Sequence, residues 1–117
     1  GLGDVYKRQL TAYSEDDPEA ASSIIQTFIE ETGKNIERMQ QALNDKEVDG
    51  IAAMAHKLLP LFTMIGVDEA IPLLEWLEVQ RGQDFSKKVK EKTDHVLQEI
   101  LIVLTKAREY EQYLLQK

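Results

Sequence analysis

Apolar residues recur at steps of three and four along almost the whole chain, and this spacing strongly limits the possible folds. Such steps place side chains on one face of an α-helix, whereas a half-buried strand alternates apolar and polar residues with a period of two. No stretch of the chain shows that alternation. The sequence therefore predicts an all-α protein. The first long stripe comprises Ile24, Ile25, Phe28, Ile29, Thr32, Ile36, Met39 and Leu43.

Capping residues divide the chain into four main helices. A carboxylate or hydroxyl before a helix satisfies its first free N–H groups, and glycine commonly ends a helix. Short connections between four amphipathic helices predict an antiparallel up-down-up-down four-helix bundle, preceded by a short extra helix over 10–13. The expected caps and helices are Asp17 for 18–43, Asp45 for 47–65 with Gly66 at its end, Asp68 for 69–80, and Ser86 for a helix ending near 115.

Two details of the helix faces lead to further expectations. Gly33 lies inside the first helix, where glycine costs up to about 1 kcal/mol relative to alanine, and close approach of a neighbouring helix would be a reason to keep it. The last helix is expected to bury Val89, Val96, Leu97, Ile100, Leu101, Leu104, Ala107 and Leu114.

The first nine residues stand apart from this pattern. Asp4-Val5-Tyr6-Lys7-Arg8-Gln9 resembles the translated end of a transposon used in sequencing libraries. We therefore expect residues 1–9 to be a non-native segment and residues 10–117 to form one bundle domain. The chain would then be the C-terminal piece of a longer protein.

Composition narrows the classes of function. The chain has 117 residues, no cysteine and a net charge of −7, so disulfides and thiolate metal sites are excluded, and nucleic acid is a poor partner. No apolar run approaches the roughly 20 residues that span a bilayer, and no signal peptide is visible, so we expect no membrane insertion and a cytoplasmic location. No glycine-rich phosphate loop or paired helical metal-ligand motif occurs, and no cofactor of its own is expected.

His56 is the most informative residue. With about 100° per residue on a helical wheel, six apolar residues of its helix lie opposite it: Ile51, Met54, Leu58, Leu61, Phe62 and Ile65. The imidazole is therefore expected to point outward from a well-anchored helix. An ordinary surface histidine remains an alternative from this periodicity alone. The second histidine, His95, lies among polar residues and carries no pattern.

The residues around His56 resemble the signature of histidine-containing phosphotransfer (HPt) domains. The segment reads Ala55-His56-Lys57-Leu58-Leu59-Pro60-Leu61-Phe62-Thr63-Met64-Ile65-Gly66, and the family pattern is Ala-His-x-Leu-Lys-Gly with a later glycine. The resemblance implies that His56 is the phosphorylated residue. Two positions depart from it, because Leu59 replaces the usual lysine and Pro60 the usual glycine. Lys57 is expected to replace part of the lost positive charge, and Pro60 to bend the helix.

The resemblance also implies a mechanism and partners. His56 would accept a phosphoryl group from the aspartyl phosphate of a response-regulator receiver domain and pass it to another receiver. Mg²⁺ is expected on the receiver, and this domain would have no autonomous kinase activity. A carboxylate from the third helix, Glu78 or less favourably Glu75, is expected to orient the imidazole. The chain would act as a monomer, and its parent protein would be a bacterial hybrid sensor kinase in a phosphorelay.

Several small or apolar residues surround the His56 sector of the helix where a solvated face would normally carry charge. We expect them to form a platform that a receiver covers during transfer, although partial burial under a neighbouring helix is the alternative. The expected docking residues are Ala52, Ala53, Leu59, Pro60, Thr63 and Met64.

Three other functions fit parts of the pattern. The helix pair of a sensor histidine kinase also carries a phosphoacceptor histidine, but usually with an acid directly after it, where this chain has Lys57. A helical interaction bundle without phosphotransfer would make His56 coincidental. A metal-binding or catalytic bundle is the third alternative, and the scarcity of ligands argues against it.

Overall fold

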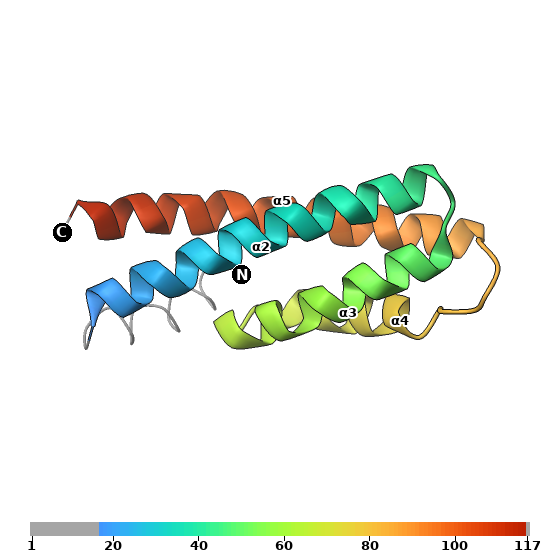
Figure 1. Cartoon of the computed structure of the whole chain (residues 1–117), viewed down its shortest axis with the longest axis horizontal. Coiled ribbons are helices and arrows are strands. Elements are labelled where there is room, and N and C mark those ends of the chain that lie inside the picture. Colours follow the sequence, from blue (N-terminus) through green and yellow to red (C-terminus); the bar gives the residue numbers. More distant parts are fainter. Residues whose placement is uncertain (1–16, 117) are drawn as a thin grey trace.

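The computed structural model describes residues 17–116 as four α-helices and one short 3₁₀ helix, with no strand among these residues. The elements, labelled as in Figure 1, are α2 (Pro18–Asn44), α3 (Val48–Ile65), η1 (Asp68–Ala70), α4 (Ile71–Glu78) and α5 (Lys87–Leu115). The predicted all-α class is confirmed. The expected helix over 10–13 and the boundary after residue 9 lie outside the described residues.

The four helices alternate in direction along one long axis (Figure 1). Helices α2 and α5 form a long antiparallel pair, and α3 and α4 pack together beside it in an elongated bundle of 48 × 20 × 18 Å. At one end α2 and α5 extend beyond α3 and α4. The up-down-up-down topology is therefore confirmed for the described residues, with α4 much shorter than the other helices.

The helix ends follow the sequence at three of the expected positions. The Asp17 side chain accepts a bond from the Ala20 N–H at 3.1 Å, and Ser86 Oγ accepts one from the Val89 N–H at 3.1 Å. Gly66 ends α3 in the left-handed conformation, with φ of 74°. These residues set where α2 and α5 begin and where α3 turns toward α4.

Two expected caps are wrong. Asp45 terminates α2 instead of starting α3, because its own N–H still bonds to Gln41 of that helix. Helix α3 starts after Glu47, whose side chain makes no capping bond. Asp68 opens the 3₁₀ turn η1 rather than capping a long helix, and α4 begins only at Ile71.

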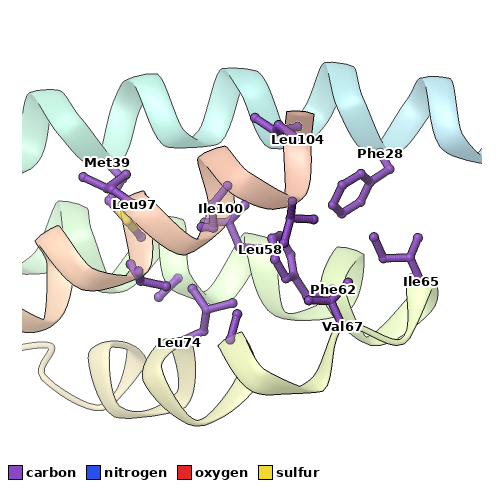
Figure 2. Packing of buried hydrophobic residues seen from close by; sticks show 14 of the residues in the cluster. Phe28, Met39, Leu58, Phe62, Ile65, Val67, Leu74, Leu97, Ile100 and Leu104 are labelled. Carbon is purple, nitrogen blue, oxygen red and sulfur yellow. The ribbon is translucent and has the colours of Figure 1, made fainter. Parts of the chain in front are cut away.

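The core is one continuous apolar cluster between the four helices (Figure 2). The rings of Phe28 and Phe62 join α2 to α3 with centroids 5.3 Å apart and planes tilted by 55°. Two details differ from the sequence prediction. Leu101 is exposed and Val103 is buried, because the stripe of α5 steps from Ile100 to Val103. A β-carbon at Gly33 would meet nothing within 4 Å, so no neighbouring helix approaches it closely.

Among the described residues, α3 is the one helix that is long and apolar enough to cross a membrane by length and composition. The core helix of a globular bundle passes the same test. Seven residues of α3 are buried in this bundle, while His56 and Lys57 at its middle are exposed. Its apolar character is thus explained by packing against α2 and α4.

The open space at Gly33 leads to a stability prediction. Gly33→Ala should raise the free energy of unfolding by about 0.5–1 kcal/mol, since alanine stiffens the unfolded chain and favours the helix. Urea unfolding followed by circular dichroism measures the change. Gly66→Ala is the control and should destabilise the domain, because alanine disfavours the positive φ there. A loss of stability in Gly33→Ala would contradict the open environment.

Candidate functional site

His56 lies at the middle of α3 with its side chain 70% exposed. Ala55, directly before it, and Leu58, two residues after it, are fully buried and hold the helix in place. Leu58 points into the core beside Phe62 and Ile100 (Figure 2). A side chain two positions away on a helix projects about 200° around the axis, so burial of Leu58 directs His56 to the surface.

Glu78, the last residue of α4, contacts the imidazole directly. Its Oε1 lies 2.5 Å from His56 Nδ1, and its side chain is 34% exposed. An ionised carboxylate only accepts hydrogen bonds, so Nδ1 donates and carries the ring proton. In the neutral imidazole the lone pair is then on Nε2. The ring is oriented by a residue 22 positions further along the chain.

The position of Glu78 depends on the packing of α4. Leu74 and Leu77 of this short helix are fully buried in the core. Trp76 packs partly against the same core, and the ammonium of Lys88 lies 5.2 Å from the centre of its ring, which joins α4 to the start of α5. The alternative orienting residue, Glu75, is exposed and makes no bond to His56 within the described chain.

The two sides of His56 differ in charge. Lys57 lies on the side of α2, where it lines a shallow groove together with Glu31, Lys34, Asn35, Arg38, Pro60 and Leu61. Glu78 approaches from the side of α4. The imidazole therefore lies between a carboxylate on one side and a basic groove on the other.

The docking residues expected from the sequence divide into three groups. Pro60, Thr63 and Met64 are exposed, with Met64 at 43%. Ala53 and Leu59 are partly buried, and Leu59 packs against the core. The structure overturns the assignment of Ala52 to a docking surface, because its side chain is 0% exposed.

The burial of Ala52 has a simple geometric reason. On the wheel Ala52 and Leu59 lie about 40° and 60° from His56 in the same direction, while Pro60 and Met64 lie in the opposite direction. Helix α4 packs on α3 and brings Glu78 to His56. It therefore covers the sector that contains Ala52 and Leu59. The exposed part of the platform is therefore displaced toward α2.

No group of three or more His, Cys, Asp or Glu side chains in residues 17–116 is arranged to hold a metal ion. His95 is exposed on α5, with Nε2 3.5 Å from Glu99 one turn later. Its carboxylate partner lies on the same helix, whereas His56 is oriented by a carboxylate from a different helix.

Periodicity did not predict the residues that α2 contributes near His56. Lys34, Asn35 and Arg38 line the groove beside Lys57, although they lie about 20 residues earlier in the chain. Asn35 carried a signal in the sequence, because it is a polar residue next to the apolar stripe, and in the structure it is only 5% exposed. The contact between α2 and this part of α3 depends on the packing angle of the two helices, which periodicity does not give.

Comparison with known proteins supplies independent information on the family. No curated protein and no solved structure matches the chain significantly. The family model described as Hpt domain matches residues 23–107, which include the whole of α3 and α4, His56 and Glu78. This match covers well over half of the 117 residues, and the chain therefore belongs to the Hpt domain family, whose members are histidine phosphotransfer domains of phosphorelays.

Proposed function

We propose that the chain is a phosphorelay intermediate that accepts a phosphoryl group from the aspartyl phosphate of a receiver domain on His56 and passes it to another receiver. The observation that carries the proposal is the state of the imidazole. Nδ1 bonds to Glu78 on an exposed ring, which leaves the lone pair of Nε2 for reaction. A nucleophile held in one tautomer and orientation is the contribution that such a domain makes to transfer.

The transfer step balances without further reactants. The Nε2 lone pair forms a bond to phosphorus as the bond from phosphorus to the aspartyl oxygen breaks, and the electron pair leaves with the aspartate carboxylate. The ring becomes a phosphorylated imidazolium that keeps its Nδ1 proton. Glu78 accepts a bond from that N–H, so its negative charge stabilises the positive charge that develops on the ring. Onward transfer to a second receiver is the same step in reverse.

Most of the electrostatic stabilisation comes from the receiver. The receiver holds Mg²⁺, while this chain supplies no cofactor and has no kinase activity of its own. The exposed residues Pro60, Thr63 and Met64, with Ala53 and Leu59 at the edge, form the apolar platform against which the receiver docks. We further propose that the domain is monomeric and cytoplasmic and belongs to a bacterial hybrid sensor kinase.

The acceptor assignment is tested with His56→Gln. A purified receiver domain charged with acetyl phosphate and Mg²⁺ should label the wild type with an acid-labile, alkali-stable group, and His56→Gln should lose all labelling because Nε2 is the nucleophile. His95→Gln is the matched control and should be labelled like the wild type. Radiolabel from the charged receiver measures transfer, and circular dichroism checks folding.

Two outcomes would contradict this assignment. Labelling that survives in a folded His56→Gln variant would place the acceptor elsewhere. Self-labelling of the wild type from ATP and Mg²⁺ without a receiver would instead indicate the phosphoacceptor helices of a sensor kinase.

The role of Glu78 is tested with Glu78→Gln. The amide oxygen still accepts a bond from Nδ1 but lacks the charge that stabilises the imidazolium, so we expect the transfer rate at saturating receiver to fall about tenfold, or about 1.4 kcal/mol. Glu78→Ala should lose more, because the ring is no longer oriented. Rapid-quench measurement of phosphoryl transfer gives the rates. Glu75→Gln, an exposed carboxylate one turn earlier, should transfer at the wild-type rate, and an equal loss there would remove the special role of Glu78.

The apolar platform is tested with Met64→Asp. Met64 is exposed, so the charge should weaken receiver binding by more than about 1 kcal/mol without lowering the stability of the free domain. Leu59→Asp should weaken receiver binding and also lower the stability of the free domain, because Leu59 packs against the core. Binding is measured by isothermal titration calorimetry with an uncharged receiver. Unchanged affinity in Met64→Asp would show that the receiver does not cover this residue.

A further inference from the structure

The groove between α2 and α3 has a charge opposite to that of the protein as a whole. Three cations line it, Lys34, Arg38 and Lys57, against one carboxylate, Glu31. The chain carries a net charge of −7, so the groove has an excess of positive charge in a protein that is negative overall. Cations on a low-dielectric surface raise the local concentration of an oppositely charged partner.

Most of this positive charge is not neutralised within the protein. Lys34 lies 3.9 Å from Glu31, an exposed pair of the kind that contributes little. Arg38 and Lys57 make no ion pair with a described acidic residue. Two exposed cations in the groove are therefore available to an external anion.

Asn35 adds a second, independent observation. Asn35 is only 5% exposed and lines the groove, and its side chain makes no hydrogen bond within the described residues. Among the described residues only Thr32 has an enclosed side-chain polar atom without a partner, so the amide of Asn35 still opens to the groove, where a polar ligand can bond to it. The groove thus offers a hydrogen-bonding group as well as cations.

The groove adjoins the phosphoacceptor. Lys57 follows His56 in the chain, and Pro60, one turn later, lines the groove while lying about 40° from His56 on the wheel. Glu78 occupies the other side of the ring. A partner that reaches Nε2 from outside therefore meets the groove on its α2 side.

We propose that this groove receives the acidic face of the phosphorylated receiver domain, with Lys34, Arg38 and Lys57 attracting it and Asn35 bonding to it. The inference rests on the proposed function. The donor face is anionic by its chemistry, since it holds an aspartyl phosphate and the carboxylates that bind Mg²⁺. The cations from α2 and Lys57 take over the role of the lysine that the family pattern places at the position of Leu59.

Charges at the edge of an interface act mainly on the association rate and on its dependence on salt. Arg38→Glu should therefore lower the second-order rate constant of phosphoryl transfer from a charged receiver about tenfold at low ionic strength. The loss should shrink as salt rises, because screening weakens attraction between exposed charges. Arg38→Gln should give an intermediate loss, since it removes the charge without reversing it.

The experiment uses a purified receiver domain, charged with acetyl phosphate and Mg²⁺, that labels the wild type. Arg108→Glu is the matched control, because Arg108 is an exposed arginine of α5 and its replacement changes the net charge equally. Its rate constant should stay within about twofold of the wild type. Labelling of His56 by the small donor phosphoramidate, which needs no docking, should be equal in all variants and shows that the acceptor is intact.

Equal losses in Arg38→Glu and Arg108→Glu, or a loss in Arg38→Glu that does not depend on salt, would overturn the groove proposal and leave the function of His56 standing. A loss in phosphoramidate labelling would also overturn it, since the groove would then act on the acceptor itself. A wild type that phosphoramidate labels but no charged receiver does would contradict the proposed function as well.

Discussion

Burial of one face of α3 is the constraint on which the site depends. Leu58 and Phe62 pack into the core against Phe28 and Ile100, so the helix has one rotational setting in the bundle. His56 is two residues from Leu58, and the same setting turns its imidazole to solvent. Hydrophobic packing that stabilises the fold therefore also fixes the direction of the nucleophile, and the acceptor needs no loop or strained backbone to hold it.

Helix α4 adds the second requirement, which is the orientation of the ring. It is short, and its position comes from Leu74 and Leu77 in the core and from the contact of Trp76 with Lys88. A carboxylate at its end reaches Nδ1 because η1 and α4 return along α3 after the turn at Gly66. Docking of α4 also explains why Ala52 is buried, since the helix that supplies Glu78 covers that sector of α3. Orientation of the imidazole and loss of docking surface on the α4 side are two results of one packing contact.

Much of this architecture could be predicted from local chemistry. Asp17, Gly66 and Ser86 mark helix ends through bonds within a few residues, and the periodicity around His56 correctly gives its exposure. The errors occur where a neighbouring element decides the outcome. Asp45 caps the end of α2 because its N–H bonds to Gln41 of that helix, and Leu101 is exposed because of the direction from which α5 meets the bundle. The proximity of Lys34 and Arg38 to Lys57 depends on how α2 crosses α3, which no single-helix pattern contains.

The positions of Leu59 and Pro60 around His56 explain how the chain can depart from the family pattern at these two residues. Leu59 lies on the α4 side of His56, the side from which Glu78 approaches, and it packs against the core. The ammonium of a lysine at this position would have to extend out of this partly apolar environment to reach solvent. Pro60 lies on the α2 side and forms part of the wall of the basic groove. Positive charge placed there is separated from Glu78 by the imidazole ring and does not form an ion pair with that carboxylate. Glu78 is then free to bond to Nδ1, while the cations act on the approaching partner. Reactivity and recognition are thereby assigned to opposite sides of a single histidine.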